Sequence, residues 1–384
     1  MFRNLKSCMA LLAITLGTTS IVRAAIPSQA DADAANHARI NSAARLMAGV
    51  PGSSSPFTRT AAWKEHSNTM NAAWSRLNGR QVAAMTSWRD AQLGKACPAG
   101  RTLLYPFSGP DFLNAHWLFP GCETIVMFGL EHIGEVPNVD TMNDRALSQL
   151  TADVRGAMSN FIERNYFITD SMARQLRTSY LRGVMPVFML SMALSGMDIV
   201  SIAPIELAPM PHGDAPGQPM RQLKGVTIEY KSADAATVQR VNYFTVDAAD
   251  KGLPHYPEFL AYIRTLAPTT TFIKSASYLL QGNEFRLMRN ALLDVSSFVV
   301  QDDSGLPFAM LENRGWDVRL HGRYDRPIPP FGGAFQVGLM RAYKAREPAP
   351  LPFTFGYQYH DFRDTRSNLI VAHRLATGAS RQSQ

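Results

Sequence analysis

Residues 102–132 read TLLYPFSGPDFLNAHWLFPGCETIVMFGLEH, and two short apolar runs in this stretch flank a turn and a helical segment. The runs 102–107 and 124–128 have the length and composition of buried strands. Between them, 108–111 has turn chemistry and 112–119 has helical spacing of apolar residues. A strand, a tight turn, a helix and a second strand within about 30 residues indicate a βαβ unit, whose strands lie parallel and adjacent.

The cysteines predict a disulfide in this unit. The chain has three, and Cys8 lies in a segment that we expect to be removed. Cys97 and Cys122 each precede one of the two strands, and the starts of adjacent parallel strands lie close enough for a bridge. An even number of cysteines in an oxidising compartment favours pairing. We therefore predict a Cys97–Cys122 disulfide.

The chain beyond this unit alternates helix and strand patterns, which predicts an α/β domain over 96–384. Expected strands are 198–205, 226–230, 240–246, 270–275 and 297–301, and expected helices are 142–193, 257–266 and 285–293. We expect a mostly parallel, Rossmann-like sheet with helices on both faces. The segments 353–359 and 368–374 flank a polar turn and predict a C-terminal antiparallel hairpin. A parallel sheet that finishes in such a hairpin resembles that of Rossmann-type methyltransferases. The resemblance concerns the order of the elements alone.

The first 24 residues have the order of a cleavable signal peptide. Arg3 and Lys6 precede a short apolar run, and small residues follow up to Ala24, after which we expect cleavage, with Ala25 as the near alternative. The apolar run is too short to span a bilayer, which takes roughly 20 residues. We expect an exported protein, periplasmic or secreted, with no transmembrane segment in the mature chain. An uncleaved anchor or an ordinary first helix is the alternative.

Charge and composition argue against nucleic acid as a partner. The formal charge of +7 falls to +4 when Arg3, Lys6 and Arg23 leave with the signal, because no acid leaves with them. The remaining basic residues form no run of five or six like charges. A chain that is 46% hydrophobic and 18% charged is globular.

The region 25–95 is expected to be helical and to pack on the α/β domain. An alanine-rich helix comes first, and a second carries Trp63 and Trp74 on one face. We expect this helix to break at 78–79 before a third that carries Trp88. The tryptophans either form a carbohydrate or lipid surface or pack against the rest of the protein, and packing is the interpretation we favour.

The first candidate site is the turn after the first strand, because ligands of open α/β sheets bind beyond the carboxyl ends of strands. Ser108 and Asp111 have the spacing of a helix cap, where free amides hold anions. Glu131 follows Gly109 by 22 residues, where dinucleotide folds place an acid for a ribose. A single glycine does not cradle a pyrophosphate, so we predict no nucleotide cofactor. A ligand pocket that includes His132 and a purely structural cap are the two interpretations.

The second candidate is the acidic pair Asp302 and Asp303 in the sequence QDDSG at 301–305. Paired carboxyl groups do acid–base work in glycosidases. Adjacent residues of an extended chain point to opposite faces, so at most one of these two faces a pocket, with a distant partner such as Glu131. A turn that ends the strand is the alternative, and we favour it.

The third candidate is 316–325, where polar and apolar residues alternate as in a half-buried strand. Its polar face gathers Arg319, His321 and Arg323, a set that can bind an anion. A solvated strand face is the alternative that we favour. The nine histidines show no metal-binding spacing and no G-x-S-x-G motif occurs, so we predict neither a metal site nor a cofactor.

Three parts of the sequence together resemble a family of uncharacterised exported bacterial proteins. They are the tryptophan helices, the block YPFSGPDF at 105–112 that runs to FGLE at 128–131, and QDDSG at 301–305 with GRY at 322–324. The resemblance spans most of the mature chain. It implies export and a single evolutionary unit, and it supplies no catalytic residue.

The function that we expect is that of a non-enzymatic envelope protein. It would bind a small or polymeric anionic ligand at the strand ends, through Ser108, Asp111, Glu131 and Arg323. The first alternative is an envelope hydrolase that uses a carboxylate as general acid or base with a histidine nearby. Its candidate residues are Glu131, Asp302, Asp303, His132 and His321. The second alternative is a relic methyltransferase-like fold without cofactor.

Overall fold

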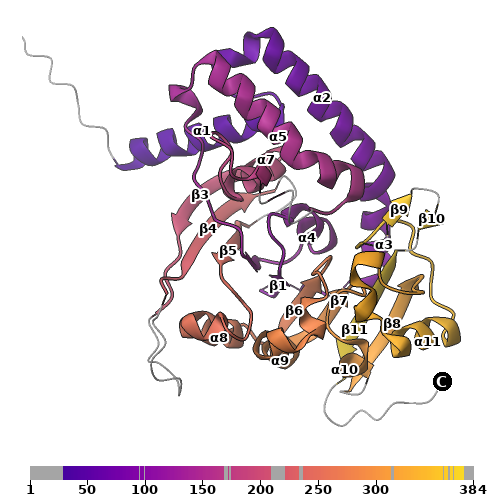
Figure 1. Cartoon of the computed structure of the whole chain (residues 1–384). Helices are drawn as coiled ribbons and strands as arrows, with labels where there is room; N and C mark the ends of the chain where they lie inside the picture. Colours follow the sequence, from indigo (N-terminus) through magenta and orange to yellow (C-terminus); the bar gives the residue numbers. More distant parts are fainter. Residues whose placement is uncertain are drawn as a thin grey trace, which may run out of the picture.

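A computed structural model describes residues 29–375 apart from 95, 99, 168–171, 173, 209–220, 233–236, 313–314, 358, 362–363 and 366. The expected signal peptide and its cleavage site lie outside these residues. The centre of the structure is a nine-stranded sheet with the order β3-β4-β5-β2-β1-β6-β7-β11-β8 (Figure 1). The fold is therefore α/β, as predicted.

The βαβ unit is confirmed. It consists of β1 (Thr102–Pro106), α4 (Phe112–Leu118) and β2 (Thr124–Gly129). β1 and β2 are parallel neighbours over the whole length of β1. The disulfide is confirmed as well, because Cys97 and Cys122 are bonded with their Cα atoms 5.3 Å apart.

Five neighbouring strands of the sheet are parallel. They are β5 (Gln239–Thr245), β2, β1, β6 (Thr269–Ile273) and β7 (Ser296–Gln301). Numbered along the chain, these five strands have the spatial order 3-2-1-4-5 of a Rossmann-like sheet. The order reverses between β1 and β6, so the connections that leave these two strands diverge and open a crevice at their carboxyl ends.

The sheet as a whole is mixed, and the expectation of a mostly parallel sheet is wrong. β3 (Asp198–Pro204) and β4 (Lys224–Lys231) form antiparallel pairings at one edge. At the other edge, β11 (Asn368–Arg374) is antiparallel to both β7 and β8 (Trp316–Gly322). Antiparallel strands can be added at an edge without a helical crossover, so the alternation of helices and strands does not reveal them.

The expected C-terminal hairpin is also wrong. The segment 353–357 is not a strand, and β9 (Tyr359–Asp361) pairs with β10 (Asp364–Thr365) and with no other strand of the described residues. β11 instead inserts between β7 and β8. Its residues Leu369 to Ala372 are all buried, and a strand that is apolar on both faces is better covered between two neighbours than at an edge.

The helical region before the sheet comprises α1 (Gln29–Ala48), α2 (Ala61–Leu77) and α3 (Ala83–Gln92). The expected break at 78–79 is wrong, because Asn78–Val82 forms a π-helical turn that joins α2 to α3. At this turn the buried Gln81 side chain exchanges hydrogen bonds with the backbone of Thr354. The turn therefore fastens the helical region to the C-terminal part of the chain.

The remaining helices complete two layers. The long helical stretch expected at 142–193 is divided into α5 (Asp144–Arg164) and α7 (Met185–Leu194). Further helices are α8 (Pro257–Thr265), α9 (Arg286–Val295), α10 (Phe308–Glu312) and α11 (Val337–Ala345). Short 3₁₀ helices occur at Pro56–Arg59, Val139–Thr141, Leu253–His255, Leu279–Gln281, Asn283–Phe285 and Pro329–Ala334.

The core has one layer on each face of the sheet. Leu103 and Tyr105 of β1 pack with α1 to α5 and α7, and Leu104 packs with α8 to α11. Figure 1 shows these two groups of helices on opposite sides of the sheet. The tryptophans pack as favoured above, because Trp88 is buried and Trp74 contacts Trp117 with ring centroids 5.9 Å apart.

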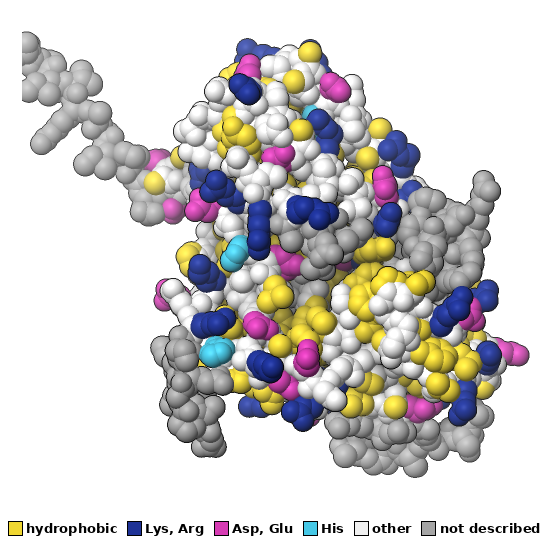
Figure 2. All heavy atoms as spheres, viewed as in Figure 1, with side chains coloured by type: hydrophobic (Ala, Val, Ile, Leu, Met, Phe, Trp, Pro, Cys, Tyr) yellow, Lys and Arg dark blue, Asp and Glu magenta, His cyan; other side chains and the backbone are white. Residues whose placement is uncertain are grey.

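No helix among the described residues is long and apolar enough to cross a membrane. On the face that Figure 2 shows, Lys and Arg side chains are dispersed, with acidic side chains between them. This distribution agrees with the absence of a basic run in the sequence.

Candidate functional site

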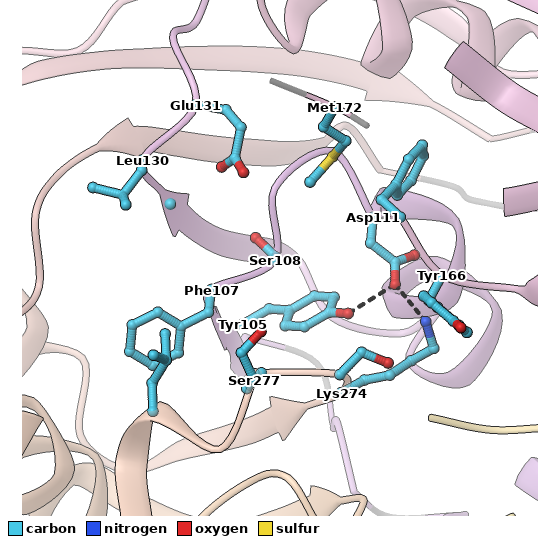
Figure 3. Close-up of a pocket in the computed structure, with 15 residues that line it drawn as sticks. Tyr105, Phe107, Ser108, Asp111, Leu130, Glu131, Tyr166, Met172, Lys274 and Ser277 are labelled. Carbon is cyan, nitrogen blue, oxygen red and sulfur yellow. Dashed lines mark hydrogen bonds and ion pairs between the residues drawn. The ribbon is translucent and has the colours of Figure 1, made fainter. Parts of the chain in front are cut away.

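A pocket with a cavity volume of about 120 Å³ lies at the carboxyl ends of β1, β2 and β6 (Figure 3). It is the crevice where the connections of β1 and β6 diverge. Its walls come from the segments that follow these three strands, with Tyr166, Phe167 and Met172 from the chain after α5. The polar side chains that line it are Tyr105, Ser108, Asp111, Glu131, Tyr166, Lys274, Ser275 and Ser277.

The turn after β1 has a left-handed backbone at Phe107 and Gly109, with φ of 55° and 49°. Gly109 adopts this conformation without steric cost, whereas Phe107 does not. Between them, Ser108 donates its backbone N–H to the carbonyl of Phe128, 3.2 Å away, which ties the turn to the end of β2. The Ser108 hydroxyl is buried and has no hydrogen-bond partner among the described residues. It is therefore available to a ligand in the pocket.

Asp111 is the N-cap of α4 and the centre of a buried polar network. Its Oδ1 accepts from the side-chain amide of Asn114 at 2.9 Å, and its Oδ2 accepts from the Tyr105 hydroxyl at 2.8 Å. The ammonium of Lys274 lies 2.9 Å from the same Oδ2 and also donates to the carbonyl of Asn165. Burial, followed by the Asp111 charge, holds the pKa of Tyr105 well above its usual value. A carboxylate thus already occupies the helix end at which the sequence predicted an anion.

Glu131 lies two residues beyond β2, and its carboxyl group packs over two glycines. A Cβ on Gly129 would lie 2.4 Å from Oε2 of Glu131, and a Cβ on Gly109 would lie 3.6 Å from it. Only glycine at 129 leaves room for this side chain. The Tyr243 hydroxyl donates to the Glu131 carbonyl at 3.1 Å and lies 3.4 Å from the carboxyl group.

The carboxyl group of Glu131 has no ion-pair partner among the described residues. Burial raises its pKa, and hydrogen bonds from the nearby backbone and from Tyr243 offset part of this rise. A carboxyl group that is desolvated in a pocket and lacks a cation is typical of a functional site. A ligand that donates hydrogen bonds would therefore stabilise the ionised form of the Glu131 carboxyl group.

The wall opposite the Ser108 turn is the segment after β6. Ser275, Ser277 and Tyr278 all have left-handed backbones, with φ between 52° and 57°. The Ser275 hydroxyl is buried without a partner among the described residues. Neither this wall nor Lys274 is among the residues expected from the sequence, although a lysine and two serines soon after a buried strand are a recognisable signal, because ligands bind beyond the carboxyl ends of strands.

Asp302 and Asp303 do not line the pocket. Both are buried at the end of β7, behind the segment after β6. Asp302 accepts from the backbone N–H of Ser275 at 2.9 Å, and Asp303 accepts from the Tyr278 hydroxyl at 2.6 Å. Burial raises the pKa of Asp302. The two acids therefore support a wall of the pocket from outside it.

The predicted site residues on β8 lie apart from the pocket. Arg319 and Arg323 are exposed and pair with the nearby Asp317 and Asp325, at 3.7 and 2.8 Å. His321 is buried against Trp88, with ring centroids 5.0 Å apart. The favoured interpretation, that this strand face is solvated, is therefore wrong at His321, because α3 covers that side chain. His132 follows Glu131 but is exposed and outside the pocket lining.

The comparisons give no relative to which a function can be traced. No family model, no curated protein and no solved structure matches the chain. In the described part of the chain, His, Cys, Asp and Glu side chains form no cluster of three that would hold a metal ion. The pocket is therefore the feature of the molecule from which a function is inferred.

Proposed function

We propose that the protein binds a small, neutral, hydroxyl-bearing molecule of about one ring in the pocket, with Glu131 as the principal hydrogen-bond acceptor. The observation that carries the proposal is the half-buried Glu131 carboxyl group, which lines the pocket and has no ion-pair partner among the described residues. Hydroxyl donors from a ligand would replace the water that this group has lost. Hydrogen bonds to a charged acceptor are also stronger than those between neutral groups.

The charges of the pocket favour a neutral ligand over the anion that the sequence led us to expect. Lys274 supplies the positive charge, and Asp111 neutralises it at 2.9 Å. Glu131 adds a carboxyl group that repels an anion when it is ionised. An anionic ligand would have to compete with Asp111 for the ammonium group, so anion binding is kept as an outcome of the test below.

The size and the lining favour a single polar ring. An engineered cavity of about 150 Å³ holds one benzene molecule, so this pocket of about 120 Å³ takes at most one ring, and a ring with substituents would project from its open side. A hydrocarbon ring would leave the hydroxyls of Ser108 and Ser275 without partners. A sugar or another cyclic polyol offers hydroxyl groups at its edge and apolar C–H faces for Phe107, Leu130 and Met172.

Native mass spectrometry of the purified mature protein is the first test, since a mass that leaves on denaturation identifies the ligand class. Calorimetric titration with D-glucose, D-ribose, myo-inositol and inorganic phosphate is the second. We expect Glu131→Gln to weaken polyol binding about tenfold or more. The matched control is Glu123→Gln, the same change at an exposed residue before β2. Binding of phosphate alone, unaffected by Glu131→Gln, would refute the proposal in favour of an anion site.

A second candidate function is hydrolysis with Glu131 as the general acid. The raised pKa of this residue favours it, because a higher pKa increases the protonated fraction of the carboxyl group at any given pH, and the protonated form can donate to a leaving group. Asp111 lines the same pocket, but its donors and Lys274 already engage it. Turnover of a nitrophenyl glycoside that disappears in Glu131→Gln would favour this function. The strand order of the sheet is also compatible with the remaining hypothesis, that the protein descends from a methyltransferase-like fold and has no cofactor.

We also propose that the protein is exported. The order of basic, apolar and small residues in the first 24 positions supports this, and a disulfide-bonded Cys97–Cys122 pair suits an oxidising compartment. N-terminal sequencing of protein purified from the periplasm or medium should give Ala25 as the first residue. An intact Met1 in that material would contradict a cleaved signal.

A further inference from the structure

We propose that Ser275 is a ligand-binding residue, and that Asp302 is a positioning residue that acts through it. The inference rests on the proposed function, because it adds a second polar wall to the pocket that Glu131 anchors. It also gives the acidic pair at the end of β7 a role that is not catalytic.

The backbone of Ser275 argues for a role of its side chain. Its φ is 52°, in the left-handed region, where a residue with a Cβ is strained and glycine is not. A loop with only a structural purpose would be more stable with glycine at this position. The Ser275 hydroxyl makes no hydrogen bond with the described residues and is buried in the pocket wall. Ser275 therefore combines a strained backbone with an unpaired hydroxyl group. A ligand hydroxyl would supply the missing hydrogen-bond partner.

Ser277 differs from Ser275 although its φ is also 52°. Its hydroxyl lies 3.0 Å from the hydroxyl of Tyr357, which also contacts the carbonyl of Ser275. The hydroxyl of Ser277 therefore has a partner within the protein. Of the two serines, Ser275 is the one whose hydroxyl is left for a ligand.

The loop is held in this conformation from the side away from the pocket. Oδ2 of Asp302 accepts from the N–H of Ser275 at 2.9 Å, and the Ser304 hydroxyl accepts from the N–H of Ala276 at 2.8 Å. Ser304 in turn donates its hydroxyl and its N–H to Oδ1 of Asp302. The next two left-handed residues are fixed by Tyr357 and by the bond from Tyr278 to Asp303.

This arrangement prepares the wall before a ligand arrives. Two successive backbone N–H groups are satisfied by Asp302 and Ser304, so the backbone that carries the Ser275 side chain is held in place relative to the pocket. Fixing a binding group in advance lowers the entropy that binding would otherwise cost. Loosening Asp302 should therefore weaken binding only while the Ser275 hydroxyl is present.

Three variants separate the strain from the hydroxyl, with melting temperature and calorimetric titration of D-glucose, D-ribose and myo-inositol as readouts. Ser275→Gly removes both, so we expect a melting temperature about 2 °C higher and binding weaker by about tenfold. Ser275→Ala keeps the strain and loses the hydroxyl, so only binding should fall. Glu347→Gly is the control, because Glu347 is an exposed residue with φ of 46° outside the pocket. It should gain stability and bind as the wild type does.

A double-mutant cycle tests the positioning role. Asp302→Asn should weaken binding in the wild-type background and have no further effect in the Ser275→Ala background. Equal effects in both backgrounds would mean that Asp302 is merely structural and would overturn its role. Wild-type binding retained by Ser275→Ala would overturn the ligand contact while leaving the proposed function intact. A wild-type protein that binds none of the three polyols would overturn both.

Discussion

Lys274 and Asp111 form a buried ion pair, with Nζ 2.9 Å from Oδ2 and only 1% and 6% of the two side chains exposed. Lys274 directly follows β6, and Asp111 caps the helix that follows β1. The pair therefore joins the two connections that diverge at the switch point of the sheet and closes the floor of the pocket between them. Glu131, Ser108 and Ser275, which are assigned to the ligand, line the same pocket as this pair.

Breaking this pair should destabilise the protein strongly. Lys274→Met leaves the Asp111 carboxylate buried without its cation, which typically costs roughly 3 to 5 kcal/mol. Adding Asp111→Asn keeps an N-cap of α4 and removes the stranded charge, so the double variant should be more stable than the lysine variant alone. Urea unfolding of the wild type, Lys274→Met and the double variant measures this. A double variant less stable than Lys274→Met would show that Asp111 matters chiefly through its other hydrogen bonds.

The free energy of unfolding should depend on pH through Glu131. Its pKa is higher in the folded protein than the ordinary value of 4.5, so the folded state holds the proton more tightly. The contribution of Glu131 to stability is thus fully present below pH 4.5 and is lost as pH rises through the folded pKa. Glu131→Gln should lack this loss and be more stable than the ligand-free wild type at neutral pH.

The measurement is a series of melting temperatures between about pH 4 and 8. The difference between wild type and Glu131→Gln should grow with pH, and Glu123→Gln should show no such growth. If Glu131→Gln proved less stable than the wild type at neutral pH, the carboxyl group would have to be stabilised within the protein, and the case for a ligand there would weaken.

His321 should make the protein sensitive to acid. Burial, followed by the charge of Arg319, lowers its pKa from 6.5 to about 4. Neither ring nitrogen has a hydrogen-bond partner among the described residues. In the unfolded chain, His321 therefore takes up a proton below pH 6.5, whereas in the folded protein it stays neutral down to about pH 4. The free energy of unfolding thus falls as pH drops from 6.5 towards about 4.

We expect His321→Phe to reduce this loss while keeping a ring against Trp88. Urea midpoints at about pH 7 and pH 5 measure the effect. The control is His132→Phe, because the His132 side chain is exposed and outside the core. An unchanged acid response in His321→Phe would assign it to the other buried histidines, His66 and His116, whose pKa values burial also lowers to about 4.

Removing the disulfide should destabilise the βαβ unit at the amino ends of its strands. Cys97 and Cys122 are separated by 25 residues, and closing a loop of this length contributes roughly 3 kcal/mol on the chain-entropy model. The variant with alanine at both positions should have a free energy of unfolding that is lower by this amount, and it should unfold at a lower urea concentration. The oxidised wild type should have a mass two units below that of the reduced chain. Two free thiols in protein isolated from an oxidising compartment would contradict the pairing.

The position of the pocket could be predicted from the sequence, whereas only some of the residues that line it could. Ser108, Asp111 and Glu131 were singled out because they follow two predicted parallel strands, and all three line the pocket. Asp302 follows β7 in the same way but points behind the neighbouring loop, and the sequence pattern does not tell these two orientations apart. Lys274 was missed because a lysine after a strand is usually solvated, and only its neighbours show that it is buried.

What the sequence determined by itself was local and short in range. Apolar runs, turn residues and the spacing of Cys97 and Cys122 fixed the parallel βαβ unit, because a right-handed crossover within about 30 residues leaves one arrangement. The position of β11 between β7 and β8, and the neutralisation of Lys274 by Asp111, 163 residues away, become visible in the folded chain alone. Strand order at an edge and the pairing of buried charges depend on which distant surfaces meet. That outcome is set by the total burial of the folded chain and leaves no periodic pattern in the sequence.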